Sequence, residues 1–361
     1  MSIKNEHKKA TAGVHFEQAA IGMRTMQTAT EGQQKSIFSE FKLAKYHITI
    51  KALEHMILPE FKGSMLRGGF GHVFKRICCA TREKTCDACL IRHSCPYAYV
   101  FETSPPEGAE YMHKQTKVPR PYVFELPLED KTEYNAGEEL TFHLVLIGRA
   151  IDLLPYFIFA IRELGEVGIT ARRHKFELTS IYAVDCLTGE EQLVYSLDNN
   201  MVHTANAVLI GSEVANWVTT FSLDRLTLNF LTPTRVKYRG NYCFNEIPFI
   251  ALVQNITIRL NALSYFHCDG VWDENIRDMR EMASSIKATR STLTKRNILR
   301  YSNRQGKKDS LSGVTGAITY EGDLGPFLPI LILGQFVHVG SDAVFGCGQY
   351  EMEGISLSLP R

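Results

Sequence analysis

The sequence predicts an α+β protein made of two similar units in tandem, each with the order strand, helix, strand, strand, helix, strand. Segments of period-two alternation and segments of helical periodicity follow one another in this order twice along the chain. A length of 361 residues suits two or three domains at roughly 150 residues each. The composition, 45% hydrophobic and 22% charged, is typical of a globular protein. This element order predicts two ferredoxin-like (RRM-like) domains.

The first unit begins with a strand over residues 42–55, in which Tyr46, Ile48 and Ile50 alternate with polar residues. A helix with a single apolar stripe follows, and Ser64 is its expected N-cap. The remaining elements are expected to be strands at 118–126 and 140–148, a helix at 151–164 and a strand at 175–184.

The second unit shows a similar order, with one additional helix and one additional strand. Its expected elements are a strand at 223–231, helices at 246–266 and 272–290, strands at 296–302 and 313–321, a short helix at 326–333, and strands at 335–339 and 345–355. We therefore expect a loosely ordered leader at 1–40, a first domain at 41–205 with a cysteine-rich insertion at 78–100, and a second domain at 206–361 with a glycine-rich loop.

Charge and hydropathy narrow the class of protein. Forty basic residues against 39 acidic ones give a formal net charge of +1, which does not exclude nucleic acid because binding depends on a local basic surface. The longest apolar run, Leu153 to Ile161, contains a proline and is much shorter than the ~18 residues of a membrane span. Residues 1–40 lack the apolar core of a signal peptide. We expect a cytoplasmic protein with no membrane partner.

Four of the nine cysteines, Cys79, Cys86, Cys89 and Cys95, fall close together. Four thiolates at this spacing, with a Cys-x2-Cys knuckle, are typical of a closed tetrahedral zinc site. An iron–sulfur cluster is the alternative metal group, and thiols buried as small hydrophobic groups are the alternative without metal. Because four thiolates leave no open position, the predicted metal is structural, and no catalytic metal is expected.

A basic run extends from Lys287 to Lys308 with eight cations and no acidic residue. Phosphate oxygens would neutralise such a run, and its tyrosine and amide side chains suit contacts to bases. The alternative is an exposed helix and loop. The residues predicted to bind RNA are Lys295, Arg296, Arg300, Ser302, Asn303, Arg304, Gln305, Lys307 and Lys308.

The C-terminal segment is rich in glycine, with Gly334, Gly340, Gly346 and Gly348 in close succession. Glycine lets a backbone approach a ligand closely and turn its amides toward phosphate. The segment opens no long helix and contains no Gly-Lys-Ser, so it is not a nucleotide-binding fingerprint. By itself it would indicate a bulged hairpin.

Together these motifs resemble those of a CRISPR-associated endoribonuclease of the RAMP superfamily, over roughly residues 42–355. The residues that carry the resemblance are Leu66 to His72, Cys95 to Ala98, Pro119 to Pro121, Phe230 to Arg235, Tyr301 to Gln305, Thr319 to Leu324, Val337 to Gly340 and Phe345 to Gly348.

The resemblance implies cleavage of precursor CRISPR RNA within its repeats, without metal, to a 2′,3′-cyclic phosphate and a 5′-hydroxyl. It also implies two ferredoxin-like domains and a glycine-rich loop near bound RNA, which adds Arg235, Gly340, Gly346 and Gly348 to the expected RNA contacts. Other CRISPR-associated subunits are expected partners, and homodimerisation stays open.

The resemblance further implies a catalytic histidine near the first helix or in the loop after it, without fixing its position. His72 lies about 160° from the centre of the apolar stripe of the helix, beside Lys75. His113 lies in a loop with Tyr111 and Lys114, which together suit base, proton donor and cation. For His72 the alternative is a histidine on a solvated helix face.

Two other classes stay open at this point. The chain could be a non-catalytic RAMP subunit that binds guide RNA in an effector complex. Alternatively, it could be a metal-stabilised interaction module with no role in RNA binding, although the acid-free basic run argues against that class.

Overall fold

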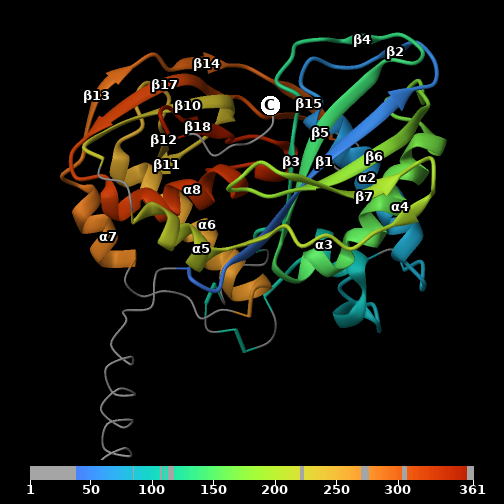
Figure 1. Cartoon of the computed structure of the whole chain (residues 1–361), viewed down its shortest axis with the longest axis horizontal. Helices are drawn as coiled ribbons and strands as arrows, with labels where there is room; N and C mark the ends of the chain where they lie inside the picture. Colours follow the sequence, from blue (N-terminus) through green and yellow to red (C-terminus); the bar gives the residue numbers. More distant parts are fainter. Residues whose placement is uncertain are drawn as a thin grey trace, which may run out of the picture. The chain divides into compact units, whose positions relative to one another are not determined.

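Two antiparallel β-sheets organise the protein, one in each half of the chain (Figure 1). The computed structural model describes residues 38–83, 85–105, 108–109, 111–112, 118–219, 223–269, 276–302 and 307–355. In both sheets the four strands of the repeated unit lie in the spatial order second, third, first, fourth. This order and the antiparallel pairing confirm that part of the α+β prediction which concerns a fold of helices and antiparallel sheets.

The first sheet has the order β3-β5-β1-β6-β7-β8, and β9 pairs with the start of β1. Its strands are β1 (Lys42–Ala52), β3 (Tyr122–Glu125), β5 (Glu139–Ile147), β6 (Phe176–Val184), β7 (Glu191–Ser196), β8 (Met201–Val202) and β9 (Val208–Ile210). Around it lie α2 (Gly63–Cys78), α3 (Pro96–Phe101), α4 (Leu154–Val167), the 3-10 turns η1 (Arg92–Ser94) and η2 (Gly148–Leu153), and the pair β2 (Met56–Ile57) and β4 (Glu133–Tyr134).

The second sheet has the order β13-β17-β10-β18, and β14 continues along β17 beyond β13. Its strands are β10 (Arg225–Thr234), β13 (Lys287–Ser291), β14 (Thr294–Arg296), β17 (Gly313–Glu321) and β18 (Tyr350–Met352). Its helices are α5 (Gly211–Val218), α6 (Phe249–His267), α7 (Ile276–Ala283) and α8 (Leu328–Val337). Two hairpins, β11 (Lys237–Tyr238) with β12 (Asn241–Tyr242) and β15 (Leu299–Ser302) with β16 (Lys307–Ser310), and two 3-10 turns, η3 (Gly325–Phe327) and η4 (Ala343–Phe345), complete this half.

Strand β1 shows how the sequence pattern sets the two faces of the first sheet. Ile48 and Ile50, at even positions, are fully buried and pack with α2 and α4 in one core. Leu43, at an odd position, belongs instead to the core of the second half. The far face of the first sheet is therefore partly covered by the second half of the chain.

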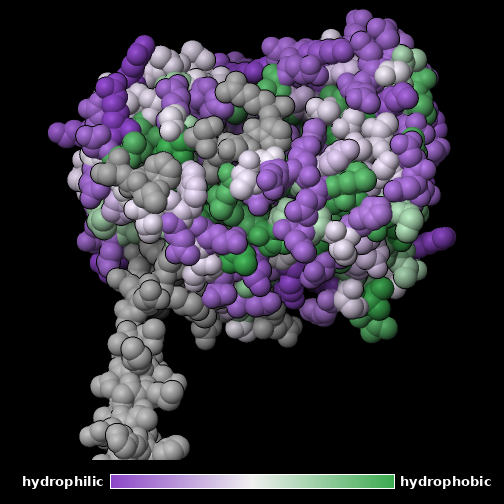
Figure 2. Space-filling view, in the orientation of Figure 1, coloured by the Kyte–Doolittle hydropathy of each residue, from purple (hydrophilic) through white to green (hydrophobic). Residues whose placement is uncertain are grey.

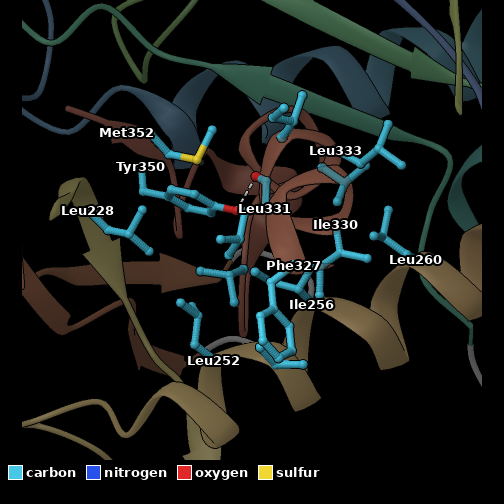
Figure 3. Close-up of a cluster of buried hydrophobic side chains, with 14 of the residues drawn as sticks. Leu228, Leu252, Ile256, Leu260, Phe327, Ile330, Leu331, Leu333, Tyr350 and Met352 are labelled. Atoms are coloured by element: carbon cyan, nitrogen blue, oxygen red, sulfur yellow. Dashed lines mark hydrogen bonds between the residues drawn. The ribbon is translucent and has the colours of Figure 1, made fainter. Parts of the chain in front are cut away.

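The core of the second half lies between its sheet and the helices α6 and α8 (Figure 3). Leu252 and Ile256 of α6 meet Leu331 of α8, and Leu228 and Tyr350 come from the sheet. The Tyr350 hydroxyl donates a hydrogen bond of 2.6 Å to the carbonyl oxygen of Leu331. This bond satisfies the one polar atom that the ring carries into the core.

The structure differs from the expected elements at several places, among them the strand expected at 345–355, which forms only at Tyr350–Met352. The helix expected at 272–290 ends at Ala283, and Lys287–Ser291 forms the edge strand β13 because β17 offers it a pairing partner. The strand expected at 335–339 is wrong for its first three residues, which belong to the helix α8. Because α8 is buried on nearly all sides, its sequence has no polar face and therefore no helical period to distinguish it from a strand. The expected N-cap Ser64 lies inside α2, whose N-cap is Lys62.

Hydrophilic side chains cover most of the face shown in Figure 2, with smaller hydrophobic areas between them. Among the described residues, no helix has the length and apolar character needed to cross a membrane.

Candidate functional site

The exposed face of α2 carries the first predicted catalytic group. His72 is exposed, and Gly68, one turn earlier on the same face, would have no atom within 4 Å of an added Cβ. Arg76 forms an ion pair of 2.9 Å with Glu163 of α4, and the Lys75 ammonium lies 5.5 Å from the centre of the Tyr97 ring. His72 therefore borders open space, and one of its two neighbouring cations is already paired.

Of the second predicted catalytic set, Tyr111, His113 and Lys114, the structure describes only Tyr111. His113 and Lys114 lie outside the described residues. Tyr111 packs with Tyr265 and Phe266 of α6, and burial raises the pKa of its hydroxyl. A tyrosine with a raised pKa holds its proton, which suits a donor rather than a base.

Phe345 of η4, in the glycine-rich segment, contacts residues of both α2 and β15. Its side chain is buried, and two guanidinium groups lie over its ring, that of Arg67 at 5.4 Å and that of Arg300 at 4.4 Å from the ring centre. A Cβ on Gly63, the first residue of α2, would collide with the Phe345 carbonyl oxygen. The glycine is therefore required for α2 to approach η4 this closely.

The glycine-rich segment is packed against protein backbone. An added Cβ would meet the Arg235 carbonyl oxygen at Gly340, the Phe124 carbonyl oxygen at 2.8 Å at Gly346, and the Val339 carbonyl oxygen at Gly348. All three residues have φ near +80°, which glycine adopts without strain. Gly346 and Gly348 are both buried; Gly346 packs against the first half of the chain and Gly348 against Val339 of the second half, and their contact with RNA stays a prediction.

Arg235 secures the same segment. Its guanidinium forms an ion pair with Asp342, donates a hydrogen bond of 3.3 Å to the Ser310 carbonyl oxygen, and lies 5.5 Å from the Tyr242 ring centre. The arginine predicted to bind RNA thus holds η4 and β16 against β10.

The basic run lies along the edge of the second sheet and in the β15–β16 hairpin. Lys295 is exposed, with its ammonium 4.9 Å from the centre of the Phe244 ring. Arg296 forms ion pairs with Glu60 and Asp130, the latter at 3.3 Å, and so connects β14 to loops of the first half. Ser302, Lys307 and Lys308 lie on β15 and β16 with side chains outside the described part, and Asn303, Arg304 and Gln305 lie outside the described residues.

The four clustered cysteines, Cys79, Cys86, Cys89 and Cys95, all line one small pocket, which Arg92 and Tyr97 also border. Burial raises the pKa of the Cys86 thiol, so the protonated thiol is favoured there. Within the described part of the chain, no three potential ligands are placed so as to hold a metal ion. The fold gathers the cysteines but does not form a closed ligand set, and the predicted zinc stays a prediction.

A row of ionisable side chains that sequence reasoning missed crosses the far face of the first sheet. Glu125, His143 and His47 are paired neighbours on β3, β5 and β1. The two imidazole rings stack with their centres 5.0 Å apart, and His47 Nδ1 lies 2.8 Å from a carboxylate oxygen of Glu191 on β7. If Nδ1 donates its proton to this carboxylate, Nε2 of His47 is the nitrogen that can accept one.

The buried end of this row is an ion pair. Lys45 Nζ lies 2.6 Å from Glu125 Oε2, and both side chains are about 5% exposed or less. Burial, helped by the neighbouring Lys45 and His47, lowers the pKa of His143 to about 2, so its ring is neutral. Only one sequence signal marked this row: Lys45 and His47 alternate with the apolar residues of β1, a pattern that indicates a solvated face.

Two family models match the chain. One is described as the CRISPR-associated endoribonuclease Cas6 and matches residues 228–350. The other is described as an N-terminal domain and matches residues 41–207.

Individual proteins agree with these matches. An uncharacterised protein of Archaeoglobus fulgidus is 26% identical over 298 residues, which cover 82% of this chain and 92% of that protein. The product complex of a Thermus thermophilus Cas6 has the same fold, with a TM-score of 0.51, 14% identity, and coverage of 86% of this chain and 99% of that one.

A partial Cas6-RT-Cas1–Cas2 complex also has a similar fold, with a TM-score of 0.52 and 14% identity. That match covers 88% of this chain and 46% of the other, so this chain spans about half the length of the protein in that complex.

Proposed function

We propose that this chain, whose residues 228–350 belong to the family of CRISPR-associated Cas6 endoribonucleases, cuts precursor CRISPR RNA within its repeats. The observation that carries the proposal is this family match, which falls on the half of the chain that holds the basic run and the glycine-rich segment. The fold shared with a Cas6 product complex over 86% of the chain supports it.

We infer that the two halves are tandem ferredoxin-like domains. The support is the strand order, which is second, third, first, fourth in both sheets, with helices packed on one face of each. Such a pair would place α2 of the first domain against η4 of the second, as the close approach of Gly63 to Phe345 requires.

The proposed chemistry is attack of the RNA 2′-hydroxyl on its own phosphate, without a metal ion. His72 is our candidate for the base that takes the 2′-hydroxyl proton, because imidazole exchanges protons near neutral pH and this ring borders open space. Lys75, one turn further along α2, would offset the charge that develops on the phosphate. His113, with Tyr111 and Lys114, remains the alternative base.

The partners that follow are CRISPR repeat RNA and other CRISPR-associated proteins. A solved Cas6-RT-Cas1–Cas2 complex of similar fold supports the second kind of partner. Zinc at Cys79, Cys86, Cys89 and Cys95 would be structural in this proposal, because it would take no part in the reaction.

The decisive experiment incubates the full chain with end-labelled repeat RNA in chelator and analyses the product ends. We expect a 2′,3′-cyclic phosphate and a 5′-hydroxyl, and no cut when the nucleotide before the cleavage site carries a 2′-deoxyribose. Cleavage that needs added magnesium, or that proceeds on the deoxy substrate, would exclude this mechanism. Tight binding without any cleavage would instead favour a non-catalytic RNA-binding subunit.

A further inference from the structure

Three segments that are far apart in sequence meet at Phe345. Arg67 comes from the second turn of α2, Arg300 from β15 in the basic run, and Phe345 from the 3-10 turn η4. Both guanidinium groups lie within 5.4 Å of the same ring centre. The aromatic ring thereby attracts two like charges to one place and restricts the freedom of both side chains.

No acidic side chain among the described residues neutralises Arg67. It forms no ion pair with any described residue, and its Nε is buried without a hydrogen-bond acceptor there. Its side chain contacts the Tyr122 hydroxyl and lies 5.4 Å from the Phe101 ring centre. Neither group offers a counter-charge, so an anion is the missing partner.

The position of this arginine on α2 relates it to His72. His72 is the fifth residue after Arg67, which corresponds to a rise of about 7.5 Å along the helix axis. At ~100° per residue, Gly68 lies between them around the helix, and its position opens onto empty space. A ligand seated on Arg67 could therefore pass over the bare backbone at Gly68 and reach His72.

We propose that Arg67 and Arg300, held by Phe345, bind a backbone phosphate of the RNA next to the nucleotide presented to His72. This inference rests on the proposed function and names the residues that anchor the substrate. Phosphate is the ligand that fits, because the planar guanidinium fork pairs two donors with two phosphate oxygens.

The test measures binding of fluorescently labelled repeat RNA to the full chain over a range of salt concentrations. We expect Arg67→Gln and Arg300→Gln each to reduce the slope of log affinity against log salt by ~0.7, and the double variant by ~1.4, as for loss of one and two phosphate contacts to a single strand. Arg67→Lys keeps the charge without the fork, so it should retain the slope and lose affinity.

Arg225→Gln is the matched control, because Arg225 lies on β10 and is paired with Glu321 at 3.6 Å; it should leave the slope unchanged. If Arg67→Gln fails to fold, Arg300→Gln still tests the pair, since Arg300 lies in the two-stranded β15–β16 hairpin, outside the two main sheets. Unchanged slopes in the glutamine variants, with or without a lower melting temperature, would overturn the phosphate site. Failure of the unaltered chain to cleave repeat RNA would instead refute the proposed function.

Discussion

His72 is accessible because the residue one turn earlier on α2 has no side chain. Side chains on a helix lean toward its N-terminus, so a residue one turn earlier would border the imidazole. That residue is Gly68, which in a helix interior costs ~1 kcal/mol relative to alanine. The empty space it leaves in front of His72 is what we expect a substrate to use.

Replacement of His72 by alanine should therefore slow cleavage by roughly 10²–10⁴ and leave RNA affinity nearly unchanged. Single-turnover rates and equilibrium binding, measured on the same preparation, separate the two effects. His47→Ala is the matched control. It removes a histidine from the same half of the chain, but one that is hydrogen-bonded to Glu191 and does not lie on α2. If His72→Ala cleaves RNA at the normal rate and His47→Ala cleaves it slowly, His72 is not the base, and His47 becomes the candidate.

The buried ion pair between Lys45 and Glu125 should contribute to the stability of the fold. Glu125→Gln leaves a buried ammonium without its partner, and we expect a loss of ~3–5 kcal/mol in the free energy of unfolding. Urea unfolding of the variant measures this loss. Glu163→Gln, which breaks the largely exposed pair with Arg76, should cost at most ~1 kcal/mol. Equal losses in both variants would mean that burial of the pair has no influence.

At the scale of an element, the segment from Cys79 to Cys95 is shaped by its cysteines. Their gathering around one pocket is the arrangement from which a closed metal site can form. Because thiolate ligation is coupled to folding of the ligand segment, loss of one ligand should cost stability as well as metal.

Elemental analysis of protein purified without chelator should therefore find close to one equivalent of zinc. Cys89→Ser should lower that content and the melting temperature, whereas Cys243→Ser, outside the pocket, should change neither. A content under about half an equivalent of zinc or iron would refute the metal site. Full metal content in Cys89→Ser would mean that the ligand set is wrong.

In the molecule as a whole, one buried histidine, His267, links the two halves of the chain, and a second, His338, is bonded within the second half. His267 of α6 shares hydrogen bonds with the Tyr99 hydroxyl at 3.0 Å and the Pro119 carbonyl oxygen at 2.8 Å, both in the first half. His338 donates from Nδ1 to the Cys347 carbonyl oxygen at 3.0 Å. Burial lowers the pKa of each to about 4, so both are neutral at pH 7.

Stability should consequently fall as the pH falls. Below the pKa of 6.5 that histidine has when unfolded, the unfolded chain binds a proton at each site and the folded chain does not until about pH 4. Each site thus lowers the free energy of unfolding by up to ~1.4 kcal/mol per pH unit in this window. Urea unfolding between pH 7 and pH 4.5 measures how the free energy of unfolding depends on pH. His267→Asn should make this dependence less steep. An unchanged pH dependence in this variant would exclude His267 as a source of it.

The local elements and most of their order follow from sequence patterns alone. Alternation in β1 and the stripe of α2 indicate a strand and a helix because each element must bury one face, and the repeat of that order indicates the two antiparallel sheets. The motifs also indicate the family whose model matches residues 228–350. These features depend on residues close together in the chain.

Which distant side chains meet, by contrast, depends on how the folded elements pack together. Lys45 and Glu125 are polar residues in sequence, and their burial follows from the second half covering one end of the first sheet. The positions of Arg67 and Arg300 at one ring follow from the docking of α2 on η4. Helical or alternating periodicity records whether a face is buried, but not what buries it, because contacts between distant segments leave no periodic signal in either one.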